Sequence, residues 1–125
     1  MAIREHTSLQ RTQKRVSTKV LARASYIESE KVLEAKLRKE ITARGGMALK
    51  LLSQLHRGLP DRLVLMPGGR TYFAEIKTTG KKPTTLQVHC HHDLIGLGFP
   101  VFVIDSTQKL EEMLNFIELE GELSE

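Results

Sequence analysis

The sequence has 125 residues, of which 40% are hydrophobic and 27% charged. These values suit one globular domain and exclude global disorder and collagen-like or low-complexity structure. The single cysteine, Cys90, excludes a disulfide scaffold and a zinc site made of cysteines alone, and it is compatible with a reducing compartment. The net charge of +4 points toward a polyanionic partner.

The charge is unevenly distributed along the chain. Residues 1–27 carry six basic residues and one acid, whereas residues 107–125 carry one basic residue and six acids. We therefore predict a basic N-terminal arm or helix over 1–27, a core over 28–106, and an acidic helix or tail over 107–125. Solvated surface at both ends is the simpler alternative.

The sequence predicts neither a membrane span nor a secretory signal. The longest uncharged stretch, 94–104, has 11 residues and is interrupted by glycines and a proline, whereas a spanning helix needs about 20 apolar residues. The first ten residues contain no apolar core. We expect a cytoplasmic protein that makes no membrane contact.

Hydrophobic spacing predicts the elements of the first half. A short helix over 8–24 and a flexible arm are both compatible with its sparse apolar residues. Apolar residues three or four positions apart predict a helix over 25–44, which a glycine pair ends. Short apolar runs predict strands over 47–53, 63–66 and 71–77, the last two joined as a hairpin by a Pro-Gly-Gly turn.

The second half predicts two helices around one strand. Thr84 and Gln87 form a capping-box pattern, so we expect a helix from there to about residue 97, with Leu86, Cys90, Leu94 and Leu97 as its apolar stripe. The apolar run 101–104 predicts a strand interior to the sheet, returning beside the third strand through a right-handed crossover. Four apolar residues trace one face of the last helix: Leu110, Met113, Leu114 and Ile117. The fold class is α/β, a mixed sheet of about four strands flanked by helices.

The residues that could form a catalytic site lie around the predicted hairpin. Because side chains alternate along a strand, Glu75 and Lys77 project from one face while Ile76 points into the core. Asp61 lies at the start of the preceding strand, within reach of Glu75 across the hairpin. Two neighbouring carboxylates suit Mg²⁺ or Mn²⁺, which can polarise a phosphodiester and activate water, and a nearby lysine can orient that water.

Neither part of this pattern is specific alone. A Glu-x-Lys triplet arises by chance in roughly one chain in three of this length, and its plain interpretation is an exposed ion pair. The conjunction with Pro60-Asp61 on adjacent strands of one hairpin is much rarer.

The pattern resembles the VRR-NUC domain of the PD-(D/E)xK nuclease superfamily. The stretches that match are LEAKLRKEITARGGMALK, GLPDRLVLMPGGRTYFAEIKTTGKKPTTLQ and GLGFPVFVIDS, which together cover about residues 33–106. The resemblance implies a restriction-endonuclease-like core and a metal-dependent DNA nuclease.

The resemblance also implies roles for single residues. Asp61 and Glu75 match the metal-binding carboxylates, and Ile76 would lend its backbone carbonyl to the metal. Lys77 matches the catalytic lysine. Glu34 matches an acidic residue on the first helix, and Gln87 a polar residue that opens the helix after the site, although a structural cap already accounts for Gln87.

Basic residues near the predicted site are candidates for phosphate contacts, which dominate DNA affinity. Lys50 precedes the site on a strand and either faces it or is solvated. The others are expected on surrounding loops, where surface exposure alone also accounts for them: Arg57, Arg62, Lys81 and Lys82.

The histidines do not predict a zinc site. His89, His91 and His92 contain no pair spaced four residues apart. His91 follows Gln87 by four residues and shares its helix face, which we interpret as a polar face near DNA. Cys90 is expected in the core.

The sequence thus favours a Mg²⁺- or Mn²⁺-dependent DNA endonuclease, and the resemblance adds branched DNA, such as four-way (Holliday) junctions, as substrate and a viral or prophage setting. Paired cuts need two active sites, so a homodimer is expected. The alternatives are a non-catalytic DNA-binding module and a repair-complex interaction module whose acidic last helix docks a basic partner, covers the sheet, packs in a dimer or shields the site.

Overall fold

The computed structural model describes residues 29–52 and 56–124. The predicted arm over 1–27 and the helix over 8–24 lie outside the described residues. The elements follow one another as α2 (Glu30–Ala43), β1 (Met47–Lys50), β2 (Arg62–Met66), a short 3-10 turn (Pro67–Gly69), β3 (Arg70–Ile76), α3 (Thr85–Gly96), β4 (Val101–Ile104) and α4 (Thr107–Ser124).

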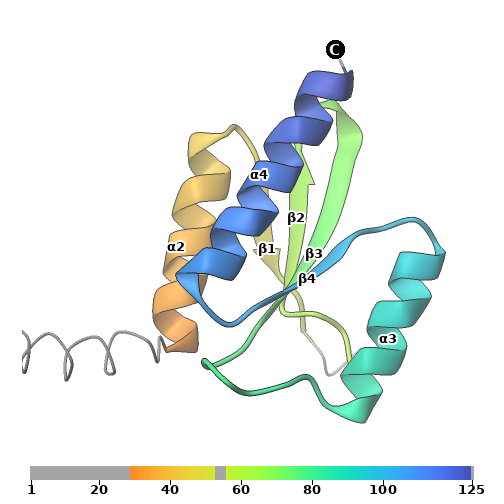
Figure 1. Ribbon diagram of the computed structural model, residues 1–125. Helices are drawn as coiled ribbons and strands as arrows, with labels where there is room; N and C mark the ends of the chain where they lie inside the picture. The colour runs from red at the N-terminus through yellow and green to blue at the C-terminus, as the bar shows by residue number, and fades with distance from the viewer. Residues whose placement is uncertain (1–28, 53–55, 125) are drawn as a thin grey trace, which may run out of the picture.

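Four strands form a single mixed sheet in the order β1-β2-β3-β4. The pairs β1/β2 and β2/β3 are antiparallel, whereas β4 lies parallel to β3. Helices α2 and α4 cover one face of this sheet, and α3 lies on the other side (Figure 1). The α/β class and the four-stranded mixed sheet predicted from the sequence are confirmed.

Helix α2 shows how local sequence fixes this arrangement. Ser29 caps it by accepting a hydrogen bond from the backbone N–H of Val32, at 3.2 Å. Its apolar stripe, Leu33, Leu37 and Ile41, is fully buried. The helix ends at Ala43, and the chain turns directly into β1.

The core lies between α2, α4 and the sheet. The sheet face toward these helices contributes Val64, Tyr72, Ala74, Ile76 and Ile104. The four apolar residues predicted for the last helix are all buried against this face. The acidic helix therefore covers the sheet, one of the positions considered for it. No helix in the described part of the chain is long and apolar enough to cross a membrane.

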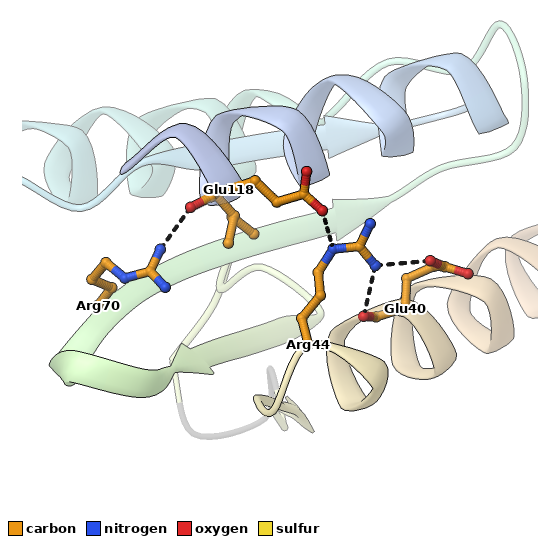
Figure 2. Close-up of polar contacts among 5 residues, drawn as sticks. Glu40, Arg44, Arg70 and Glu118 are labelled. Carbon is orange, nitrogen blue, oxygen red and sulfur yellow. Dashed lines mark hydrogen bonds and ion pairs between the residues drawn. The ribbon is translucent and has the colours of Figure 1, made fainter. Parts of the chain in front are cut away.

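Two arginines hold α4 in place (Figure 2). Arg44, just after α2, donates hydrogen bonds to the carboxylates of Glu40 and Glu118, both at 2.8 Å. These two partners raise the pKa of Arg44 above its ordinary value. Arg70, at the start of β3, donates to the carbonyl oxygen of Ile117 at 2.6 Å. The contacts tie α4 both to α2 and to the sheet.

Strand β4 is an edge strand of the described sheet, so the prediction that it is interior is wrong. Its apolar composition has another cause, because helices lie on both of its faces. Contacts with α4 and with α3 are present, and Phe102 packs against the core. The α3 stripe was also predicted incorrectly in part: Cys90 is buried, but Leu86 and Leu97 are exposed.

Gly46 gives a test of the tight junction between α2 and β1. A Cβ atom at Gly46 would lie 2.6 Å from the carbonyl oxygen of Leu65 and would also collide with the Met66 sulfur. We predict that Gly46→Ala lowers the free energy of unfolding by about 1–3 kcal/mol. The control is Gly96→Ala in α3, where nothing lies within 4 Å and removal of a helical glycine raises stability by about 0.5 kcal/mol. Urea denaturation measures both, and equal effects of the two variants would contradict the prediction.

Candidate active site

The β2/β3 register brings two acids together. Arg62 pairs with Ala74 in this antiparallel ladder, so Asp61, one residue earlier, lies opposite Glu75. The Oδ2 atom of Asp61 accepts a hydrogen bond from the backbone N–H of Ile76 at 2.7 Å. This bond fixes the Asp61 carboxylate beside the strand that carries Glu75.

Glu75 is almost completely buried, with 1% of its surface exposed. Its Oε2 atom accepts a hydrogen bond from Gln87 Nε2 at 2.9 Å and lies 3.5 Å from Lys77 Nζ. Its Oε1 atom is buried and has no hydrogen-bond partner. The two oxygens therefore differ: one is held by protein groups, and the other keeps its lone pairs available.

Electrostatics at Glu75 favour an added positive charge. Burial, and after it the charge of Asp61, raise the pKa of Glu75 to about 7 against the opposing charge of Lys77. Lys77 therefore neutralises only part of the negative charge that Asp61 and Glu75 carry when both are ionised.

Gln87 connects this site to the start of α3. Its Oε1 atom accepts a hydrogen bond from the backbone N–H of Thr84 at 2.8 Å, and the Thr84 hydroxyl accepts one from the backbone N–H of Gln87 at 3.2 Å. The capping box is thus formed as predicted, while the amide nitrogen of the same side chain reaches Glu75. The cap and the contact with the site use different atoms of one residue.

Glu34 and Arg62 form a separate pair, with Arg62 Nε 3.7 Å from Glu34 Oε1. Arg62 also donates to the carbonyl of Ala48 at 3.2 Å and is 8% exposed. The prediction that Arg62 lies on a loop is wrong, since it begins β2. Because Lys50 pairs with Arg62, and Arg62 with Ala74, all three share the sheet face opposite to that of Glu75.

A hollow of about 270 Å³ opens beside the acids. Asp61 and Gln87 line it. The other lining residues come from the loop before β2 and from the start of α3 with its cap: Arg57, Gly58, Leu59, Thr84 and Leu86. Lys81 and Lys82 are exposed on the loop between β3 and α3. The loops next to the site therefore carry three basic residues: Arg57, Lys81 and Lys82.

His91 is the residue whose place the sequence reasoning missed. It is buried, and its Nε2 atom lies 3.9 Å from Glu75 Oε1. Burial, with the charges of His92 and Lys77, lowers the pKa of His91 below its ordinary value. Its interpretation as part of a polar helix face near DNA did not include this burial beside Glu75. The four-residue spacing from Gln87 was the available signal, since Gln87 itself was expected to reach the site.

This geometry agrees with the comparisons with known proteins. No family model matches the sequence. The fold is similar to a solved structure described as a VRR_NUC domain, with a TM-score of 0.65, 29% identity, and coverage of 69% of this chain and 94% of that one. The sequence is 44% identical over 85 residues to "Putative nuclease p44" of Acyrthosiphon pisum secondary endosymbiont phage 1, covering 68% of this chain and 90% of the phage protein.

The fold and these similarities define a nuclease with a restriction-endonuclease-like core. The chain belongs to the VRR-NUC family. The family resemblance found in the sequence is thereby confirmed.

Because the Glu75 carboxylate is buried, we predict that the free energy of unfolding of the metal-free protein depends on pH. Its pKa is about 7 in the folded chain, against an ordinary 4.5, so between these values the folded state binds more protons than the unfolded state. The free energy of unfolding therefore falls as pH rises through that window, and the decrease is complete above pH 7. In chelator at pH 8, Glu75→Gln is expected to be more stable than wild type by about 1–3 kcal/mol, with little difference at pH 4.

Chemical denaturation at both pH values measures this effect. The matched control is Glu112→Gln on the exposed surface of α4, which is expected to change stability by less than about 0.5 kcal/mol. A Glu75→Gln protein that is less stable than wild type at pH 8 would contradict the assignment of Glu75 as a strained buried acid.

Proposed function

We propose that the protein is a Mg²⁺- or Mn²⁺-dependent DNA endonuclease with Asp61, Glu75 and Lys77 at its active site. The observation that carries the proposal is the β2/β3 register, which puts Asp61 opposite Glu75, with Lys77 Nζ 3.5 Å from a Glu75 oxygen. Two carboxylates can hold a divalent cation for phosphodiester hydrolysis, and a lysine beside them can stabilise the charge that develops on the phosphate.

The residues present fit a divalent cation. Glu75 Oε1 is a buried oxygen with no hydrogen-bond partner, and burial together with the charge of Asp61 raises the pKa of Glu75, so an added positive charge would favour its ionised form. Within 29–52 and 56–124, no group of three or more acidic, histidine or cysteine side chains could hold a metal by itself. Mg²⁺ does not need such a cage, because it binds through one or two carboxylates and takes its other ligands from water and substrate phosphate.

Asp61, Glu75 and the backbone carbonyl of Ile76 would hold the cation. When bound, it would polarise the scissile phosphate and lower the pKa of a water molecule. Gln87 fixes the orientation of Glu75 through Oε2, and Lys77, beside that carboxylate, orients the attacking water or balances charge on the phosphate.

Other residues are assigned to substrate binding. Arg57, Lys81 and Lys82 lie on the segments next to the hollow and are proposed to contact DNA phosphates. Lys50 and Arg62 lie on the other face of the sheet, and Arg62 is engaged by Glu34 and Ala48. A DNA contact from either would have to be made around the end of the strands. Glu34 would act on the site only through Arg62.

The finer proposal is that the enzyme cuts branched DNA, such as four-way junctions, as a homodimer. A single small domain offers one site, and a two-fold dimer would match the symmetry of a junction and make paired cuts. A host-cell cytoplasm is the proposed setting, since the similar nuclease is a phage protein.

Cleavage of labelled duplex DNA tests the nuclease activity. With Mg²⁺ or Mn²⁺ the protein is expected to cut, and with chelator it is not. Lys77→Ala is expected to lower the rate about 10²–10⁴-fold because it removes charge stabilisation at the reacting phosphate. Lys109→Ala on the exposed surface of α4 serves as the control and should cut at the wild-type rate. Retained DNA binding with no cutting under either metal would favour a non-catalytic binding module.

Substrate choice and assembly need a separate experiment. We expect faster cutting of a four-way junction than of linear or flapped DNA of the same sequence, and a dimer by light scattering in the presence of the junction. Equal rates on all substrates would remove the junction preference but keep the nuclease. A monomer on junction DNA would remove the dimer.

A further inference from the structure

Helix α3 is not held in place by the hydrophobic core. Among the residues that the structure describes, the continuous core draws on α2, α4 and the sheet, and no residue of α3 belongs to it. The helix itself buries Cys90 and His91. The contact from Gln87 to Glu75, at 2.9 Å, therefore needs another support, because a helix that is free to shift cannot fix the position of a side chain.

That support comes from the loop before β2, at Gly58. A Cβ atom at Gly58 would lie 2.6 Å from the carbonyl oxygen of Leu86 and 3.3 Å from the Cβ atom of Cys90. The backbone of the loop thus lies directly against the first turns of α3. The φ angle of Gly58 is +84°, a conformation that glycine adopts without steric strain. Both the close approach and the backbone angle depend on the absence of a side chain.

The contact joins the chain neighbours of two site residues. Gly58 lies three residues before Asp61, and Leu86 lies directly before Gln87. The Asp61 end of the loop is fixed to the sheet, because the Asp61 carbonyl accepts a hydrogen bond from the backbone N–H of Leu51 at 2.8 Å. The loop therefore connects the part of the sheet that carries Asp61 to the part of α3 that carries Gln87.

We propose that Gly58 is a positioning residue for the site: the absence of a side chain there lets α3 approach closely enough for Gln87 to hold Glu75 beside Asp61. The inference rests on the proposed function, because Gln87 acts on a carboxylate of that site. A methyl group at Gly58 would meet helix backbone, so α3 would have to move by several tenths of an ångström. Since a misplacement of about 1 Å can lower the rate of an enzyme 10²-fold, such a shift is large enough to measure.

The experiment compares Gly58→Ala with Gly68→Ala in the full-length protein. Both glycines have a φ angle of +84°, so alanine meets the same backbone strain at either position. Nothing lies within 4 Å of a Cβ atom at Gly68, which belongs to the turn between β2 and β3. The contact with α3 therefore distinguishes the two variants. Urea denaturation identifies the conditions under which both are fully folded.

Nuclear magnetic resonance of the metal-free proteins reports the position of Gln87 without a cleavage assay. Gly58→Ala is expected to shift the side-chain amide signals of Gln87 and the backbone signals of residues 84–92, while the signals of α4 keep their wild-type values. Gly68→Ala should leave the Gln87 signals unchanged.

The wild-type protein provides a test that does not depend on the folding of a variant. A nuclear Overhauser effect is expected between the α-protons of Gly58 and the β-protons of Cys90, because a Cβ atom at Gly58 would lie 3.3 Å from that of Cys90. Its absence would overturn the proposal.

Single-turnover cleavage at saturating protein then measures the effect on the reaction. With Mg²⁺, Gly58→Ala is expected to lower the rate about tenfold, and Gly68→Ala less than about twofold. The effect of Gly58→Ala should disappear in a Gln87→Leu background, because two residues that act through one contact are not additive.

The outcomes separate this proposal from the proposed function. Unchanged Gln87 signals in a folded Gly58→Ala protein overturn the positioning role, whether or not the wild type cuts DNA. Equal rate losses in the two glycine variants assign the loss to backbone strain and also overturn it. A full further loss in the double variant overturns the action through Gln87. A wild-type protein that cuts DNA with neither metal overturns the proposed function, while the Gln87 signals still decide whether Gly58 positions that residue.

Discussion

The structure depends on the antiparallel register of β2 and β3. That register places Asp61 opposite Glu75 and gives Asp61 the backbone N–H of Ile76 as a hydrogen-bond donor. A shift of one residue would send Glu75 to the core face, away from Gln87 and from the Asp61 side of the hairpin. The arrangement of helices on both sides of the sheet follows from the same constraint. One face of β3 packs in the core, and the other face presents Glu75 beside Asp61.

Burial of Glu75 sets a structural requirement for the rest of the domain. An ionised carboxylate that is 1% exposed opposes folding unless it is paired. Lys77 and Gln87 supply part of that pairing, and the continuous core between α2, α4 and the sheet supplies the stability that holds the arrangement together. The polar ties from Arg44 and Arg70 lie on this supporting side of the sheet (Figure 2).

Local patterns predicted much of this fold. The 3.6-residue period gave the buried stripes of α2 and α4, and the two-residue period of the strand gave the opposite directions of Glu75 and Ile76. The capping box located the start of α3 at Thr84. Each of these depends on residues close together in the sequence.

The predictions that were wrong concern features that depend on tertiary packing. An apolar run such as 101–104 is equally suited to an interior strand and to an edge strand covered by helices on both faces. Arg62 follows a loop-like sequence, yet the sheet extends to it and buries it. The burial of His91 depends on how closely α3 approaches Glu75, which lies 16 residues earlier in the chain. Helical spacing predicts which residues share a face of α3, but it does not predict the distance from that face to Glu75.

The double use of Gln87 has a consequence for ligand binding. A free glutamine samples many rotamers, and ordering such a side chain opposes an association by about 0.5–1.5 kcal/mol. Here the cap at Thr84 has already selected the rotamer that points the amide nitrogen at Glu75. The conformational entropy of the Gln87 side chain is therefore lost when α3 folds, not when a ligand binds. A ligand that reaches Glu75 finds its carboxylate already oriented by the residue that caps α3.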